Sequence, residues 1–316
     1  MAEVAVSVVM PAHNAAATVA EAVRSVLAQT LRDFELIVID DGSIDETARI
    51  VADQGDARIV LLRQGRKMGV AAALNRGLAR ASGVFVARMD ADDRCAPGRL
   101  EHQVRFLESH DEVALVGTAI HLMNERGEVF DTRVRPGDDE YLQRELLVSN
   151  PICHGSVMMR RGIVAALGGY DERLLHVEDL DLWLRLAEVS RLALLSEPLY
   201  YWRVHPASIT QREHTVMAAA AQHARDLAWE RRLHGRDRYG RKLVRWPADA
   251  TGRRLLAEHC VVWGREALRQ KRAGRALALF LQAAALNPQC PRLAQALRHA
   301  HAAFAKRVSS SLRSKL

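Results

Sequence analysis

The stretch Gly83-Val84-Phe85-Val86-Ala87-Arg88-Met89-Asp90-Ala91-Asp92-Asp93 places an acidic cluster directly after an apolar segment with the pattern of a β-strand. Three carboxylates within four residues repel one another, and a divalent cation bound among them would remove that repulsion. Asp90 and Asp92 offer the oxygen ligands that Mg²⁺ and Mn²⁺ prefer. A solvated acidic turn is the alternative explanation, because aspartate is common in turns.

The chain before this stretch alternates strand patterns with helix patterns. Thr18 with Glu21, and Ser43 with Glu46, have the spacing of a capping box, which predicts a helix at each pair. Alternation of strands and helices is typical of an α/β fold whose mostly parallel sheet has helices on both faces. The strands predicted in this half are Val4–Met10, Glu35–Ile39, Arg58–Leu62 and Val84–Ala87.

Polar and acidic residues follow three of these strands, at 11–14, 40–43 and 90–93. In open α/β sheets, ligands bind where the parallel strands end. The sequence has neither GxGxxG after the first strand nor GxxxxGKS/T anywhere, so the common phosphate-binding loops are absent. A nucleotidyltransferase would usually have a glycine-rich, basic loop at 11–14, which disfavours that class. Nucleotide binding at this edge would therefore use a different design.

The composition is that of a globular protein: 316 residues, 49% hydrophobic and 26% charged. No run of about 18 apolar residues predicts a membrane span, and the first residues lack the basic flank of a signal peptide. The four cysteines are widely spaced without a CxxC pair, which predicts neither a zinc site nor a disulfide framework. We expect a protein of the reducing cytoplasm.

Positive charge is concentrated in the C-terminal third. From Arg225 to the end there are 21 Lys and Arg against 6 Asp and Glu, a net charge of +15, whereas the rest carries −8. Helix patterns fill this region, and the spacing of Trp263, Gly264 and Phe280 resembles one helical-hairpin repeat. We predict an α/β domain at 1–212 and a basic α-helical extension at 213–316. The extension is expected either to dock on an anionic membrane surface or a partner, or to present solvated helix faces.

Four motifs occur in order along the first two thirds of the chain: VVMPAHN at 8–14, FELIVIDDGS at 34–43, DADD at 90–93 and EDLDLWLR at 178–185. In this order and spacing they resemble the family 2 glycosyltransferases, an inverting family with the Rossmann-like GT-A fold. The resemblance extends from Val4 to Thr210. One departure is His13, where the family usually has Tyr or Phe, and an imidazole can still stack.

The resemblance implies a nucleotide pocket at the first strand ends. Asp41 would accept a hydrogen bond from the base, for which the N3–H of uracil or thymine is a suitable donor, although Asp41 also fits a strand-ending turn. Asn75 and Arg76 would reach the nucleotide, although an exposed helix face explains them equally well. The full set of implied nucleotide contacts is Pro11, Ala12, His13, Asn14, Asp41, Asn75, Arg76 and Asp90.

The resemblance also implies that Asp92 binds Mn²⁺ or Mg²⁺ directly, with Asp90 directed to the ribose or to a bound water. His205 resembles the histidine of a late Arg-X-His motif and would complete the metal shell, while Arg203 faces the diphosphate. The ion would bridge both phosphates and stabilise the charge that grows on the leaving diphosphate. A lone histidine is also often structural.

Glu178 and Asp179 precede an apolar helical run, where acids commonly stabilise a helix N-terminus. The resemblance implies that one of them is the general base that takes the proton from the acceptor hydroxyl. We assign this role to Asp179, with Glu178 orienting it or binding the acceptor, and the reverse order stays open. His154 is a candidate contact to the diphosphate or the acceptor. Trp183 is a candidate contact too, although a place in the core explains it better.

Together these residues predict a metal-dependent, inverting glycosyltransferase. It would move a sugar from a nucleoside diphosphate, with UDP favoured, to a hydroxyl of a glycan or lipid-linked acceptor in surface polysaccharide synthesis. The alternative is a catalytically silent sugar-nucleotide-binding scaffold that acts through its helical tail, and intact Asp90, Asp92 and Asp179 argue against it. Nucleic-acid binding is not expected, because the basic region contains no recognition module.

Overall fold

The computed structural model describes residues 4–135, 137–204, 214–243 and 250–302. Its packing divides the chain into two compact units. Unit 1 comprises Met1–Leu146 and Asn150–Ala228, and unit 2 comprises Leu147–Ser149 and Trp229–Leu316. The sheet lies in unit 1, whereas the described part of unit 2 is mainly helical. The domain boundary after residue 212 stays a prediction.

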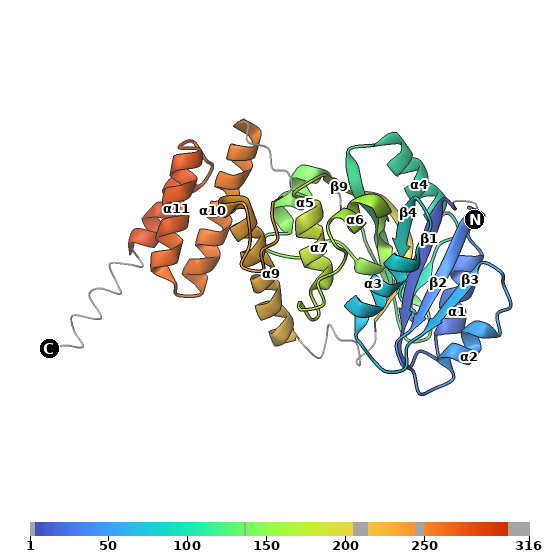
Figure 1. Ribbon diagram of the computed structural model, residues 1–316. Helices are drawn as coiled ribbons and strands as arrows, with labels where there is room; N and C mark the ends of the chain where they lie inside the picture. The colour runs from blue at the N-terminus through green and yellow to red at the C-terminus, as the bar shows by residue number, and fades with distance from the viewer. Residues whose placement is uncertain (1–3, 136, 205–213, 244–249, 303–316) are drawn as a thin grey trace. The chain divides into compact units, whose positions relative to one another are not determined.

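Unit 1 is built on a nine-stranded sheet in the order β3-β2-β1-β4-β8-β6-β9-β5, with β7 paired to β6 (Figure 1). The first four strands are parallel, and Val8 of β1 aligns with Leu36 of β2 and with Ala87 of β4. Helices connect them, as parallel neighbours require. These strands are β1 (Val6–Ala12), β2 (Phe34–Asp40), β3 (Ile59–Arg63) and β4 (Phe85–Arg88). The four predicted strands are thus confirmed.

The other five strands make the sheet mixed. They are β5 (Arg94–Cys95), β6 (Val113–Met123), β7 (Val129–Arg133), β8 (Met158–Arg160) and β9 (Arg191–Arg203). Because β8 pairs antiparallel with both β4 and β6, those two strands run in the same direction. The long strand β9 lies parallel to β6 and antiparallel to β5, which brings its end beside the loop after β4. The sequence did not predict β9.

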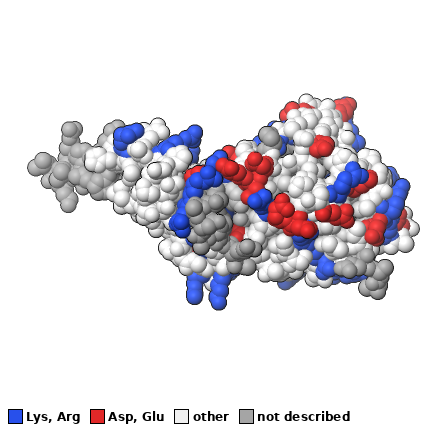
Figure 2. All heavy atoms as spheres, turned by 90° about the horizontal axis from the view of Figure 1, so that it is seen from above, with Lys and Arg blue, Asp and Glu red and all other residues white. Residues whose placement is uncertain are grey.

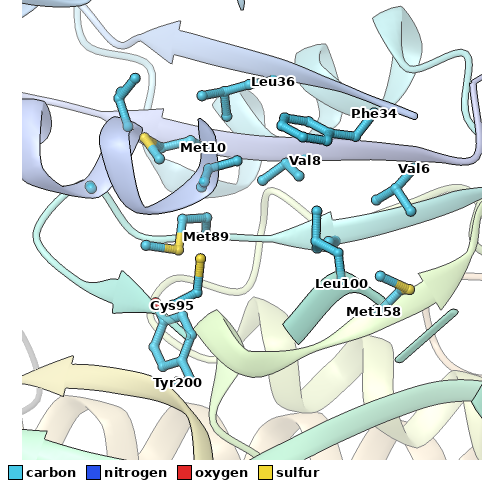
Figure 3. Packing of buried hydrophobic residues seen from close by; sticks show 14 of the residues in the cluster. Val6, Val8, Met10, Phe34, Leu36, Met89, Cys95, Leu100, Met158 and Tyr200 are labelled. Atoms are coloured by element: carbon cyan, nitrogen blue, oxygen red, sulfur yellow. The ribbon is translucent and has the colours of Figure 1, made fainter. Parts of the chain in front are cut away.

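Helices cover both faces of the sheet, as predicted. In unit 1 they are α1 (Val19–Leu27), α2 (Thr47–Ala52), α3 (Val70–Arg80), α4 (Arg99–Ser109), α5 (Asp139–Glu145), α6 (Arg161–Ala166) and α7 (Glu178–Leu186). Alternate residues of a strand point to opposite faces, so Val8 and Met10 pack in a core with α1 and α4 (Figure 3). Val9 faces α3, where a Cβ on Gly77 would lie 2.4 Å from the Val9 side chain. Glycine therefore lets α3 approach the sheet closely.

The two helices that the capping-box spacings predicted are both present, but the capping boxes at their starts do not form. Thr18 precedes α1, and its hydroxyl donates to the carbonyl of Ala91 at 3.0 Å instead of capping the helix. Ser43 lies ahead of the start of α2, and its hydroxyl accepts the backbone N–H of Asn14 at 2.9 Å. The capping-box prediction is therefore wrong at both places, because these side chains bind distant loops at the strand ends.

The described part of unit 2 contains a helical hairpin. The helices are α9 (His214–His234), which the division between the units crosses, α10 (Ala250–Arg269) and α11 (Ala273–Leu286), followed by helical residues 293–302. A Cβ on Gly264 would lie 2.2 Å from the ring of Phe280, so glycine allows α10 and α11 to pack closely. This contact joins two of the residues whose spacing resembled a hairpin repeat.

Part of the positive charge of unit 2 is internal. Asp237 accepts a hydrogen bond from Arg231 and another from Arg241, both at 2.8 Å, and the Arg231 side chain is 1% exposed. The charge available to a partner is therefore smaller than the composition suggests. On the face that Figure 2 shows, basic and acidic residues lie side by side over part of the molecule, whereas toward the left end the visible charged side chains are basic. Among the described helices, none combines the length and the apolar character that a membrane span requires.

Candidate active site

A cleft of about 600 Å³ opens where β4 ends. Its lining combines segments that are far apart in the sequence: the loop after β4, the 3-10 turn His154–Ser156, the start of α7 and the end of β9. The volume lies in the range of small-molecule binding sites. The predicted site residues that line this cleft are Asp90, Asp92, His154, Glu178, Asp179 and Arg203.

The loop after β4 gathers three carboxylates. Oxygens of Asp90, Asp92 and Asp93 lie within 4.8 Å of one another. Asp93 is buried and accepts hydrogen bonds from the Tyr200 hydroxyl at 2.6 Å and from the Arg203 backbone N–H at 2.7 Å. These two bonds attach the loop to β9, whereas Asp90 and Asp92 line the cleft.

The surroundings of Asp90 and Asp93 oppose the ionisation of these two carboxyl groups. Burial raises the pKa of Asp90; Arg88 beside it lowers that pKa in part, and Asp92 raises it again. Burial, together with the charges of Asp90 and Asp92, raises the pKa of Asp93 well above its ordinary value. A group of desolvated oxygen ligands fits a hard divalent cation, whose charge would offset their mutual repulsion.

Arg203, at the end of β9, holds the acidic loop in place. Its Nε donates to the carbonyl of Asp92 at 2.7 Å, and its Nη2 donates to Glu21 at 2.6 Å. Its Nη1 donates to the carbonyl of Glu125 at 2.8 Å. Each nitrogen of the guanidinium therefore has a protein acceptor. The contact between Arg203 and a diphosphate stays a prediction.

Glu178 and Asp179 enter the cleft from the start of α7. The Asp179 carboxylate accepts hydrogen bonds from Asn150 Nδ2 at 2.7 Å and from the Leu180 N–H at 2.7 Å. The Oε2 of Glu178 is buried without a hydrogen-bond partner among the described residues. Burial and the charge of Asp179 raise the pKa of Glu178 to about 7, and burial also raises the pKa of Asp179. Carboxylates tuned toward neutral pH are suited to proton transfer.

His154 connects the cleft to buried aromatic side chains. Its Nε2 lies 2.9 Å from the Tyr170 hydroxyl, and its ring meets the ring of Trp183 edge-on with centroids 5.6 Å apart. Burial, and then the charge of Arg88, lowers the pKa of His154 well below its ordinary value, so the imidazole is neutral near pH 7. Trp183 is 0% exposed, so in this structure it supports His154 from the core.

The first strand ends form a second group of loops, beside the cleft. Residues 11–12 end β1 and are buried. The Nδ1 of His13 lies 2.9 Å from the carbonyl oxygen of Asp41, and Asn14, at φ 50°, accepts the Ile44 N–H at 3.0 Å. The structure therefore brings these predicted nucleotide contacts together, but they do not line the cleft itself.

Asp41 is buried within this second group. It accepts hydrogen bonds from Gln64 Nε2 at 2.8 Å, from the Met68 N–H at 2.7 Å and from the Gly69 N–H at 2.9 Å. The Asp41 carboxylate thus binds the segment that precedes α3, a contact that the sequence did not predict. Its contact with a nucleotide base stays a prediction.

Asn75 and Arg76 face away from the cleft lining. The side chain of Asn75 donates to the carbonyl of Tyr170 and accepts its N–H, both at 2.9 Å. Arg76 is exposed, and its Nη1 donates to the carbonyl of Arg63 at 3.1 Å. Asn75 therefore fixes the loop that carries Tyr170, the hydrogen-bond partner of His154.

Comparison with known proteins identifies the family. Residues 7–168 match the family described as Glycosyl transferase family 2. The chain belongs to this family. It is 38% identical to the putative glycosyltransferase EpsE of Bacillus subtilis over 216 residues, which cover 66% of this chain and 77% of EpsE. It is also 35% identical to the amylovoran biosynthesis glycosyltransferase AmsE of Erwinia amylovora, over 50% of this chain and 59% of AmsE.

Solved structures share the fold of this glycosyltransferase. S. aureus TarS 1-349 in complex with UDP-GlcNAc superposes with a TM-score of 0.66 at 16% identity, over 98% of this chain and 92% of TarS 1-349. The complex of TarS 1-349 with UDP gives a TM-score of 0.64 at 18% identity, over 99% and 92% of the two chains. The predicted GT-A fold is thus confirmed, and the prediction that the chain is an enzyme of this class is confirmed by the family.

Sequence reasoning on this glycosyltransferase missed Arg88 and Tyr200. Arg88 lines the cleft, and Tyr200 holds Asp93. A signal for Arg88 was present, because a charged residue in a buried strand pattern is costly unless it has a partner. Tyr200 had no such signal, because its contact depends on the unpredicted strand β9. His205, the predicted histidine ligand, lies outside the described residues.

Proposed function

We propose that this glycosyltransferase moves a sugar from UDP to a hydroxyl of a glycan or lipid-linked acceptor, with inversion and with Mn²⁺ or Mg²⁺ as cofactor. One observation carries the proposal. A single cleft contains both a cluster of acidic oxygens, at Asp90 and Asp92, and a pair of carboxylates suited to proton transfer, at Glu178 and Asp179. An inverting transfer needs both groups, one on each side of the reacting carbon.

Asp92 and Asp90 would hold the divalent ion, with His205 as a third candidate. When bound, the ion would stabilise the negative charge that develops on the leaving diphosphate. Arg203 and Tyr200 contribute indirectly, since they fix the backbone of Asp92 and the carboxylate of Asp93. The loop is therefore held in its ligand geometry by β9 and needs little rearrangement to bind.

Asp179 is the base in this proposal. It takes the proton of the acceptor hydroxyl as that oxygen attacks the anomeric carbon. Asn150 holds the Asp179 carboxylate through its side-chain amide at 2.7 Å, which fixes the direction of proton transfer. Glu178 lies beside it, with a buried Oε2 that has no hydrogen-bond partner among the described residues, and a negative charge on Glu178 would make Asp179 a stronger base.

The choice of donor and acceptor draws on similar proteins. TarS, which shares the fold, has been crystallised with UDP and with UDP-GlcNAc. AmsE is named for amylovoran biosynthesis, and WbnJ of Escherichia coli, 32% identical over 64% of this chain and 81% of WbnJ, is named for O-antigen biosynthesis. These names favour UDP as the donor nucleotide and a surface polysaccharide as the product.

A donor screen tests the proposal. UDP-, GDP- and dTDP-sugars are supplied with Mn²⁺, with Mg²⁺ or with EDTA, and release of the nucleoside diphosphate is measured. We expect release from a UDP-sugar, loss of release in EDTA, and a decrease of about 10²–10⁴-fold in Asp179→Asn. Asp53→Asn, which changes a carboxylate 60% exposed on the surface, is the control and should retain wild-type turnover. Wild-type turnover in Asp179→Asn would exclude this base.

We also propose that the reaction takes place in the cytoplasm, with the basic helices of unit 2 docking the enzyme on the inner face of an anionic membrane. Exposed basic side chains of these helices, such as Arg254, Lys271 and Arg272, support this placement. Flotation with vesicles containing anionic lipid tests it, with the triple glutamine variant as the comparison. Equal flotation of the two proteins would argue against docking through these residues.

A further inference from the structure

Arg88 lines the cleft, and the proposed reaction does not yet use its buried side chain. It ends β4, lines the cleft, and its side chain is only 7% exposed. Its backbone is fixed, because its N–H donates to the Val157 carbonyl at 3.0 Å and its carbonyl accepts from Arg99 at 2.8 Å. The position of the side chain is therefore built into the sheet.

The guanidinium of Arg88 is only partly satisfied by the protein. Its Nη1 pairs with the carboxylate of Asp90. Its Nε is buried and has no hydrogen-bond partner among the described residues. A buried charged donor without an acceptor costs roughly 1–3 kcal/mol or more, so such a group in a folded protein calls for an explanation. An arginine can only donate, so the missing partner is an oxygen acceptor.

The surroundings of Arg88 place it between the two halves of the site. It pairs with Asp90 on one side, and on the other it is near enough to lower the pKa values of Glu178 and Asp179, against the larger effect of burial. His154, which also lines this part of the cleft, is held neutral by burial and by Arg88. Arg88 is thus a fixed positive charge between the acidic loop and the pair of carboxylates on α7.

The geometry of an inverting transfer determines which part of the substrate lies next to the Arg88 guanidinium. The attacked carbon must stand between the leaving diphosphate, at Asp90 and Asp92, and the acceptor oxygen, at Asp179. The ring that carries this carbon is the transferred sugar, and its substituents are hydroxyl and acyl oxygens. These are the acceptors that the guanidinium lacks.

We infer that Arg88 binds the transferred sugar, by donating a hydrogen bond to a ring-substituent oxygen, while Asp90 holds its guanidinium in the required direction. The inference rests on the proposed function and extends it to the sugar. A site built to donate to such an oxygen rejects an analogue that lacks it, because the buried donor is then left unpaired. Arg88 is therefore a determinant of which sugar is accepted.

The test separates binding of the nucleotide from binding of the sugar. Dissociation constants are measured with Mn²⁺ for UDP and for the UDP-sugar that the donor screen shows to be turned over. Arg88→Lys keeps a charge to pair with Asp90 but removes the fork of donors. We expect it to weaken binding of the UDP-sugar by about tenfold or more and to change the affinity for UDP by less than about twofold.

Arg160→Lys is the matched control. Arg160 lies on the neighbouring strand β8, donates from Nε to the Val113 carbonyl at 2.9 Å, and does not line the cleft. We expect it to lower thermal stability without changing the ratio of the two dissociation constants. If Arg88→Lys fails to fold, Arg88→Gln, which keeps an amide donor, is measured in the same way.

Each outcome bears on a different statement. Equal weakening of UDP and UDP-sugar in the Arg88 variant would overturn the inference, since Arg88 would then act only through Asp90 on the nucleotide side. Unchanged binding of both ligands would overturn it as well. Absence of UDP binding by the wild-type protein would instead reject the proposed donor, and the inference with it.

Discussion

Two acidic loops of this enzyme look alike in sequence but differ in structure. The turn acids, Asp40 and Asp41, lie at the end of β2, and the cleft acids, Asp90, Asp92 and Asp93, follow β4. Both loops leave buried strands that flank β1. The Asp41 carboxylate accepts three hydrogen bonds from the segment 64–69, whereas oxygens of the three cleft acids lie within 4.8 Å of one another.

The difference lies in the segment that packs over each strand end. The hydrogen-bond donors of that segment decide how far the carboxylate at the strand end is already bound by the protein. Gly42, at φ 69°, lets residues 66–67 pass so closely that a Cβ would lie 2.5 Å from the Arg66 carbonyl carbon. The backbone N–H groups of Met68 and Gly69 then donate hydrogen bonds to the Asp41 carboxylate. After β4 the segment that packs over the loop is β9, which binds the Asp93 carboxylate through Tyr200 and Arg203, while Asp90 pairs with Arg88. The side chains of Asp90 and Asp92 still line the cleft, where a cation from solvent can reach them.

The largest expected effect comes from removing one charge in each loop. Asp92→Asn should lower kcat on the order of 10³-fold, because a carboxylate that binds the cation is lost where charge develops. Asp41→Asn should act mainly on the KM for the donor, by about tenfold, since its proposed partner is the base. Steady-state kinetics over a range of Mn²⁺ concentration measure both.

The dependence on Mn²⁺ separates the two loops further. We expect excess Mn²⁺ to restore part of the activity of Asp92→Asn and none of that of Asp41→Asn. If the two variants lose kcat equally and respond equally to Mn²⁺, the distinction between turn acids and cleft acids is wrong.

A smaller effect is expected in the pH dependence, where only the cleft should matter. The pKa of Glu178 is raised to about 7, and that of Asp179 is also raised, in both cases chiefly by burial. Asp179 acts as the base only when it is ionised, so kcat/KM should fall as the pH falls through the raised pKa of Asp179. Glu178→Gln removes the neighbouring charge, so the fall should move to lower pH.

Asp41→Asn is the control for this profile, because the turn acids take no part in proton transfer. It should leave the position of the fall unchanged while the KM for the donor rises. A profile of the wild-type enzyme that stays flat down to about pH 5 would show that neither carboxylate of α7 is titrating as proposed.

The sequence predicted the first half of the fold well and the contacts between its parts poorly. The strands β1 to β4 were predictable because each is a short run rich in apolar and β-branched residues, and their carboxyl ends had to meet at one edge. Strand β9 was not, because Arg191–Arg203 includes Pro198 and exposed polar residues and pairs with β6 far back in the chain. Without β9, the roles of Tyr200 and Arg203 in holding the acidic loop cannot be derived.

Local rules failed where distant partners competed for the same side chain. Thr18 and Glu21 have the spacing of a capping box, yet Thr18 binds the carbonyl of Ala91 and Glu21 binds Arg203. Both partners belong to the acidic loop or to the strand that supports it. The sequence predicted that these two residues cap a helix, whereas in the structure they bind the acidic loop and the strand that supports it.

The smallest effect concerns Gly42, the glycine over which residues 66–67 pack. An alanine substituted for Gly42 or for Gly55 would have similar backbone strain, since φ is 69° and 64°, and this strain alone costs about 1–2 kcal/mol. At Gly55 the added Cβ meets nothing within 4 Å, whereas at Gly42 it meets the backbone of residues 66–67. Gly42→Ala should therefore lower the free energy of unfolding more than Gly55→Ala, as measured by denaturant titration. It should also raise the KM for the donor, because displacing the segment 64–69 withdraws the N–H donors from Asp41. Equal destabilisation by the two substitutions, with an unchanged KM, would mean that close packing over Gly42 is not what distinguishes the turn from the cleft.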